Sequence, residues 1–140
     1  MKKTIVLLSI LCCTATLFGQ QRWTVSHQKK TILKNAGEDE KKNIIVINKA
    51  TLSLSGCLTI RFKINDGTVN RTLMADDSSR VGLKSWENVK TTISVKNADL
   101  KKLFDGRDKL LFYFTEIPKD PAKAAVVRMR PLHICTLVLK

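Results

Sequence analysis

The sequence lacks the short motifs that mark the common hydrolases and nucleotide-binding enzymes. It contains no Gly-x-Ser-x-Gly turn, no His-Glu-x-x-His metal motif and no glycine-rich phosphate loop. The paired carboxylates Asp76 and Asp77 lie in a predicted turn, where aspartate is favoured for local hydrogen bonding. We therefore predict a protein without catalytic activity and without a cofactor.

The sequence also lacks an apolar run of about 20 residues, the length that a membrane-spanning helix requires. Its longest apolar run extends from about Thr4 to Phe18, after the positive start Met1-Lys2-Lys3 and before Gly19. This arrangement is typical of a secretory signal peptide. We expect a signal peptide over residues 1–19, a single mature domain over residues 20–140, and a secreted or periplasmic location.

Cysteine is scarce, and two of the four cysteines, Cys12 and Cys13, lie in the expected signal peptide. A lipid anchor on either would need a small residue directly before the cysteine, and Leu11 and Cys12 occupy those positions. The other two, Cys57 and Cys135, would form a disulfide in many exported domains. Closing a loop of about 78 residues would stabilise the fold by roughly 4–5 kcal/mol in the chain-entropy model. Two separate thiols are the alternative, since Cys57 shares the outward parity of its strand.

Acidic residues are in the minority, with 12 Asp and Glu against 25 Lys and Arg and a net charge of +13. Removal of Lys2 and Lys3 with the signal peptide would leave about +11. Such a charge either keeps an exported domain soluble or binds an anionic partner, such as lipopolysaccharide, an acidic glycan, the cell wall or a membrane surface. Expected export, scattered basic residues and a single tyrosine argue against nucleic acid.

Short segments of alternating polarity predict an all-β fold. The clearest is 58–64, where Leu58, Ile60, Phe62 and Ile64 are expected to face the core. Further strands are predicted at 22–27, 31–34, 43–48 (buried), 71–75, 81–86 (a weak edge), 91–96, 109–115 (interior), 126–130 and 132–139, with Pro131 as a bulge or a switch between strand partners at the boundary of the last two.

Two parts of the chain repeat one pattern, in which Ala50 and Leu52 correspond to Ala98 and Leu100. Each pattern places a short helical crossover, whose leucine closes the end of the core, between two strands; Asn97 is suited to cap the second helix. Such crossovers join strands of different sheets. The pattern therefore favours an immunoglobulin-like or related two-sheet β-sandwich with one or two short helical crossovers.

A soft-metal site is one interpretation of the C-terminal strand, because Met129, His133 and Cys135 share a parity and suit copper. At ~3.3 Å per residue, His133 lies about 7 Å from Cys135 and about 13 Å from Met129 along the strand. Other strands would have to contribute ligands, for example His27 or Met74. A core methionine beside a partly buried histidine is the alternative.

A basic stripe is a second interpretation. Arg61, Lys63, Arg128 and Arg130 are all predicted to point outward, on strands that could be neighbours. Arginine binds anions through two parallel hydrogen bonds, so the four could form an anion-binding face. The alternative is that the arginine stems merely cover apolar surface.

Three segments of the chain carry a resemblance: the end of the leader at Phe18-Gly19-Gln20-Gln21, residues 97–102, and residues 132–137. With these, the chain resembles small exported β-sandwich proteins of Bacteroidetes-type bacteria. The resemblance implies a fold and a location. It carries no activity over to this chain.

Taken with the charge, these patterns predict a non-catalytic binding or interaction module for an anionic cell-envelope partner. The alternatives are a copper-binding envelope protein, or an accessory or inhibitor protein that presents a sheet edge or the Pro118–Pro121 loop to a partner protein.

Overall fold

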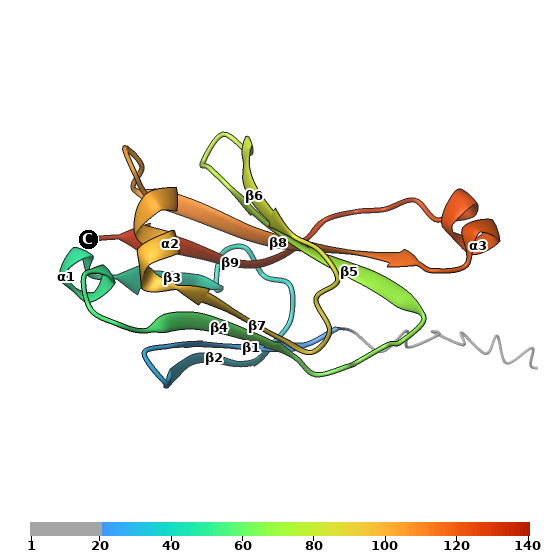
Figure 1. The fold of residues 1–140 in the computed structure, drawn as a ribbon, viewed down its shortest axis with the longest axis horizontal. Coiled ribbons are helices and arrows are strands. Elements are labelled where there is room, and N and C mark those ends of the chain that lie inside the picture. Colours follow the sequence, from blue (N-terminus) through green and yellow to red (C-terminus); the bar gives the residue numbers. More distant parts are fainter. Residues whose placement is uncertain (1–20) are drawn as a thin grey trace, which may run out of the picture.

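A computed structural model describes residues 21–140, so the expected signal peptide lies outside the described residues. Within this range the chain forms two stacked β-sheets with three short helices (Figure 1). The predicted two-sheet β-sandwich is confirmed.

Sheet A has the strand order β2-β1-β4-β7, and all of its neighbouring strands are antiparallel. Sheet B has the order β3-β9-β8-β5-β6, in which only the β3–β9 pair is parallel. The β4–β7 and β5–β8–β9 neighbours correspond to the B–E and C–F–G neighbours of the immunoglobulin fold. The strands are β1 (Trp23–His27), β2 (Lys30–Ala36), β3 (Ile44–Ile47), β4 (Cys57–Phe62), β5 (Val69–Asp76), β6 (Gly82–Trp86), β7 (Thr92–Lys96), β8 (Lys109–Pro118) and β9 (Leu132–Leu139).

Both predicted helical crossovers join strands of different sheets. Helix α1 (Lys49–Leu52) leads from β3 to β4, and α2 (Asn97–Leu103) leads from β7 to β8. Leu52 and Leu100 are buried and belong to the core. The two crossovers therefore close one end of the sandwich as the sequence pattern predicts.

The prediction that Asn97 caps α2 is wrong. Its side chain is buried, and Nδ2 donates to the carbonyl oxygens of Thr51 and Leu54, each at 3.1 Å. Its Oδ1 lies 3.0 Å from Nε2 of His27. Because these partners lie on α1, the turn after it and β1, Asn97 fastens α2 to the rest of this end of the sandwich.

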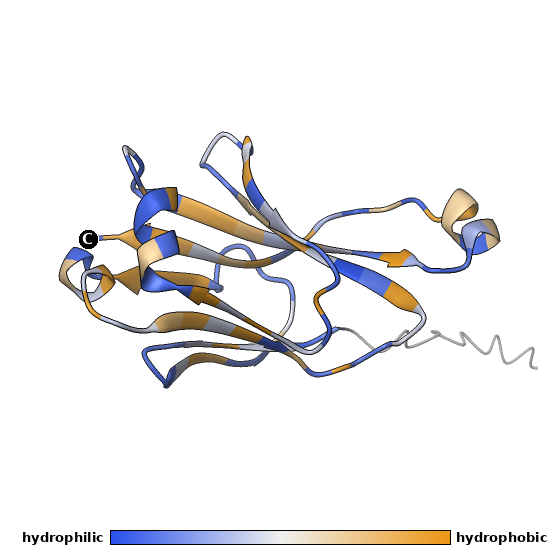
Figure 2. Cartoon of the chain, viewed as in Figure 1, coloured by the Kyte–Doolittle hydropathy of each residue, from blue (hydrophilic) through white to orange (hydrophobic). Residues whose placement is uncertain are grey.

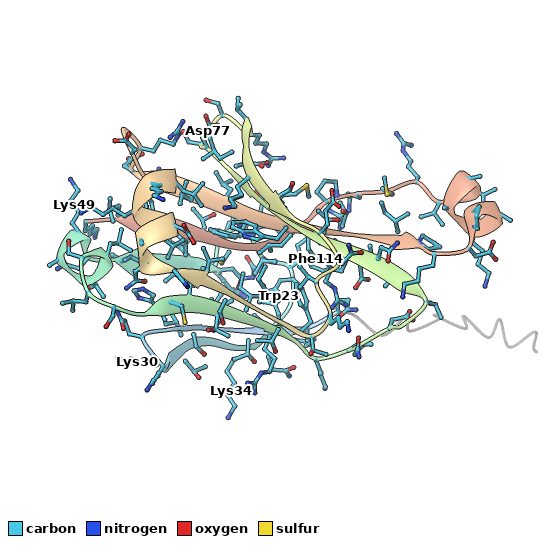
Figure 3. All side chains as sticks on the ribbon, viewed as in Figure 1. Trp23, Lys30, Lys34, Lys49, Asp77 and Phe114 are labelled. Carbon is cyan, nitrogen blue, oxygen red and sulfur yellow. The ribbon has the colours of Figure 1, made fainter. Side chains whose placement is uncertain are left out.

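The core lies between the sheets, where Trp23 and Phe114 meet at the centre with ring centroids 5.5 Å apart (Figure 3). The alternation predicted for β4 is confirmed for Leu58, Ile60 and Phe62, which are buried. Ile64 is exposed instead, because β4 ends at Phe62 and the chain turns away from the core.

Strand β3 was predicted to be buried, and only Ile45 and Ile47 are. Ile44 and Val46 are about half exposed, because β3 is an edge strand whose outer face no other element covers completely. A run of β-branched residues predicts a strand, but it does not distinguish an edge strand from a central one.

The chain before β9 differs most from its prediction, since residues 126–130 are not a strand. Asp120 accepts a hydrogen bond from the backbone nitrogen of Ala122 at 3.0 Å, and Pro121 occupies the first helical turn. These two signals start the helix α3 (Pro121–Val126), which is followed by irregular chain up to β9. The predicted strand at 126–130 is thus wrong.

Strand β9 itself lies between β3 and β8, as an apolar segment should (Figure 2). Its bulge is not at Pro131. The register with β8 shifts instead between the pairs Phe112–Cys135 and Tyr113–His133, so one extra residue, Ile134, is accommodated on β9.

Candidate anion-binding surface

The four strands of sheet A contain no aspartate or glutamate. They carry four basic residues, and all of them are exposed: Lys30, Lys34, Arg61 and Lys96. Strands of sheet B, by contrast, include Asp76 and Glu116. Sheet A is therefore the sheet whose strands carry cations and no carboxylate, although Lys84 and Lys109 of sheet B also form no ion pair within the described chain.

Hydroxyl groups fill the outward positions between these cations. On neighbouring strands Thr24, Arg61 and Thr92 form one row. Ser26, Thr59 and Ser94 form the next row, and Thr59 Oγ1 lies 3.0 Å from Ser94 Oγ. Cys57 and Lys96 form the third row. We call the outward side chains of these three rows, together with Thr31 and Lys34 of β2, the sheet A face.

Arg61 and Lys96 lie on adjacent strands, four residues apart in register, which corresponds to about 13 Å along the strand direction. Neither side chain forms an ion pair within residues 21–140. Lys30 and Lys34 extend away from the sandwich beside β2 (Figure 3). These ammonium and guanidinium groups are thus free to bind an anion from solution.

The structure divides the four basic residues predicted as one stripe. Arg61 lies on β4 and Lys63 directly follows it, whereas Arg128 and Arg130 lie in the irregular chain before β9. Because β4 and β9 belong to different sheets, a stripe containing all four is not formed. Arg130 is instead bound to Glu38, with its two terminal nitrogens 2.7 and 3.2 Å from the carboxylate oxygens.

The three predicted soft-metal ligands do not share a face. Met129 is exposed in the irregular chain, His133 lies on the outer side of sheet B, and Cys135 lies in the core. The bulge separates His133 from Cys135, since it turns both Ile134 and Cys135 toward the interior, and Met129 is apart because it lies before β9 begins. Within residues 21–140 no three His, Cys, Asp or Glu side chains are placed to hold one metal ion.

Cys57 and Cys135 are both free thiols in the structure. Cys57 points outward from sheet A, with its sulfur 3.5 Å from Thr59 Oγ1. Cys135 is fully buried in sheet B, and burial raises the pKa of its thiol. The predicted bridge is not formed, because the two side chains belong to different sheets and Cys57 faces away from the interior.

The outer side of sheet B holds a second group of polar residues, with a different character. The rings of Tyr113 and His133 are 5.4 Å apart, and both side chains are buried. Glu38 bonds Arg130 and also accepts from the backbone nitrogen of His133 at 3.3 Å, while Glu40 pairs with Arg80. The charged groups on this side of sheet B are thus paired with one another beside the two buried rings.

Burial also changes the acidity of these two rings. It lowers the pKa of His133, partly offset by the negative charges of Glu40 and Glu38, and it raises the pKa of Tyr113. His133 Nε2 lies 2.9 Å from Thr136 Oγ1, whereas Nδ1 of His133 and the hydroxyl of Tyr113 have no hydrogen-bond partner within the described chain. The imidazole is therefore held in its neutral form near neutral pH.

One buried charge was not anticipated from the sequence. Arg71 lies on the inner face of β5. It donates hydrogen bonds through Nε to Glu116 at 2.8 Å and through Nη2 to the carbonyl of Ile64 at 3.1 Å. Its guanidinium carbon also lies 4.1 Å from the ring centroid of Phe62, on which it stacks. It also donates to the carbonyl of Lys90. The sequence indicated this burial only through position: Arg71 lies two residues before Leu73 in one strand, so both side chains point to the same inner face.

No protein-family model matches the chain, and no curated protein matches it. Among residues 21–140, none of the helices is long and apolar enough to span a membrane. A function must therefore be argued from the surfaces described above.

Proposed function

We propose that this protein is a non-catalytic binding module that holds an anionic polymer of the cell envelope on the sheet A face. One observation carries the proposal: this face combines unpaired cations with rows of hydroxyl groups, and its strands contain no carboxylate. A polyanion that approaches it meets attraction without local repulsion.

The spacing of the charged groups favours a polymer over a small anion. Arg61 and Lys96 lie too far apart to share one phosphate or sulfate, but a chain lying along the strands can present successive anionic groups to both. Between them, Thr59 and Ser94 offer hydroxyls that donate to or accept from sugar oxygens. Sulfated, phosphorylated or uronic-acid polysaccharides have this chemistry.

Dextran sulfate, with uncharged dextran as its control, tests the proposal in a titration followed by calorimetry. We expect dextran sulfate alone to bind, with an affinity that falls steeply as salt is added. The double variant Arg61→Gln/Lys96→Gln should bind about tenfold more weakly, because two charge-assisted contacts are removed.

The matched control is Lys123→Gln/Arg128→Gln, which removes the same charge from a part of the molecule outside the sheet A face. This control should retain the wild-type affinity within about twofold. Equal weakening of both double variants would show that net charge and not this face determines binding. Binding that is absent, or insensitive to salt, would also overturn the proposal.

A further inference from the structure

The connection from β8 to β9 projects from one end of the sandwich as an arm (Figure 1). Residues 121–130, here called the arm tip, consist of α3 and the irregular chain that follows it. Helix α3 buries none of its residues. Apart from the ion pair of Arg130 with Glu38, the tip is therefore held by local structure and not by packing on the core.

Its local structure is nevertheless defined at the base. Asp120 caps α3 through Ala122, and the backbone nitrogen of Lys119 donates to the carbonyl of Thr68 at 2.8 Å. The second contact joins the arm to the β4–β5 connection. Both contacts lie before or at the start of α3, so the apolar side chains beyond them are not needed to anchor the arm.

Large apolar side chains are unusually exposed at the tip. The exposed fractions are 83% for Val126, 44% for Val127 and 51% for Met129. Isolated exposed apolar residues are common on protein surfaces, but three within four positions of a projecting segment form a patch. Because the patch stands on a projection, it is suited to enter another apolar phase and not to receive a ligand.

Positive charge surrounds these side chains. Residues 119–130 contain five charged residues, and Asp120, the single acidic one, has its carboxylate engaged in capping α3. Lys123 and Arg128 form no ion pair within residues 21–140. At the same end of the sandwich the β4–β5 connection adds the exposed residues Lys63 and Ile64.

We propose that the arm tip docks on an anionic phospholipid bilayer, with Val126, Val127 and Met129 entering the headgroup region and Lys123 and Arg128 contacting lipid phosphates. Apolar side chains combined with Lys and Arg bind the interface of anionic membranes, through burial of the apolar groups and attraction of the basic ones to lipid phosphates. A bilayer accommodates a convex tip by local displacement of lipids, whereas a protein partner would need a groove of matching shape.

Membrane docking by the arm is independent of polymer binding by sheet A. The tip extends from one end of the molecule, beyond the strands of the sandwich, and none of its residues belongs to the sheet A face (Figure 1). The same molecule can therefore use both surfaces together.

Co-sedimentation with vesicles tests the docking proposal. The wild-type protein should bind phosphatidylglycerol vesicles and not phosphatidylcholine vesicles. Val126→Ser/Val127→Ser should lower the affinity about tenfold or more, because two apolar side chains no longer enter the interface. Lys123→Gln/Arg128→Gln should lower it by a similar factor and reduce its salt dependence.

Two controls separate the arm from the rest of the surface. Leu54→Ser/Val81→Ser removes exposed apolar side chains elsewhere, and Arg61→Gln/Lys96→Gln removes charge from the sheet A face; both should bind vesicles as the wild type does. Wild-type vesicle affinity in Val126→Ser/Val127→Ser, equal binding to both lipids, or absence of vesicle binding would overturn the proposal. Loss in either control would do the same.

The two proposals fail in distinguishable ways. Val126→Ser/Val127→Ser should still bind dextran sulfate with wild-type affinity, and Arg61→Gln/Lys96→Gln should still bind vesicles. If the valine variant loses dextran sulfate and keeps vesicles, the tip belongs to a polymer site and membrane docking is wrong.

Discussion

The outer sides of the two sheets use charge in opposite ways. On sheet A, Arg61 and Lys96 are exposed and form no ion pair within the described chain, and hydroxyls surround them. On sheet B, Arg80 and Arg130 are bound to carboxylates of the loop at 37–43, close to two buried rings. The cations of the sheet A face are therefore unpaired, whereas these two arginines, although more than half exposed, are paired with a loop beside sheet B.

This difference shows why net charge alone says little about function. A basic residue that is already paired with a carboxylate of the chain has to give up that partner before it binds a ligand. Unpaired cations occur in several parts of the described chain, and the strands of sheet A combine them with an absence of acidic residues. From this difference we expect three further contrasts, in thiol accessibility, in the contribution of arginines to stability, and in the dependence of stability on pH.

The largest difference is expected in thiol accessibility. Cys57 on the outer side of sheet A should react with a maleimide in the native protein, whereas Cys135 should react more than about a thousandfold more slowly, because its exposure requires the core to open. Mass spectrometry should find one label per native chain and two after denaturation. A native protein that takes up no label and gains two on reduction would contradict the free thiols.

The next largest difference concerns two arginines. Arg71→Ala should lower the free energy of unfolding by about 3–5 kcal/mol, because it leaves Glu116 and buried carbonyls without their donor. Arg61→Ala on the sheet A face should change it by about 0.5 kcal/mol or less. Urea unfolding measures both. The variant Arg71→Met/Glu116→Gln should lose less than Arg71→Ala; an equal or greater loss would show that the stacking on Phe62 dominates.

The smallest effect is a dependence of stability on pH at His133. Its pKa in the folded protein lies below the ordinary value, so the unfolded chain takes up the proton first as the pH falls. The stability from the neutral ring is complete above about pH 6.5 and is lost below it, by at most about 1.4 kcal/mol per pH unit. Thermal unfolding between pH 7 and pH 5 should show this loss.

His133→Gln provides the control, because it retains a polar side chain that does not titrate. The variant should lose the part of the acid sensitivity that the His133 ring contributes, while the charged groups that act on His133, which are Glu40, Glu38, Arg80 and Asp39, stay in place. Identical pH profiles in the two proteins would contradict a neutral buried imidazole.

Several local features could be predicted from the sequence because they depend on neighbouring residues. The alternation of Leu58, Ile60 and Phe62 follows from strand geometry, and the start of α3 at Pro121 follows from a capping aspartate and a proline. The crossovers could also be predicted, since the same Ala-x-Leu pattern at 50–52 and 98–100 follows two apolar strands. None of these depends on strand order.

The site residues could be predicted less well because they depend on strand order. Arg61 and Arg130 have the same character in the sequence, yet Arg61 forms no ion pair within the described chain while Arg130 meets Glu38, which lies 92 residues away. The expected face with Met129, His133 and Cys135 required an unbroken alternation through β9. The bulge opposite Tyr113 removes that alternation, and the sequence contains no separate sign of it.

By itself, the sequence determines a basic β-sandwich with short helical crossovers, because polarity period, turn residues and charge are properties of neighbouring positions. The tertiary structure alone decides which cations are free. Pairing of a charge is a contact between distant segments, and strand order and register bring those segments together or keep them apart.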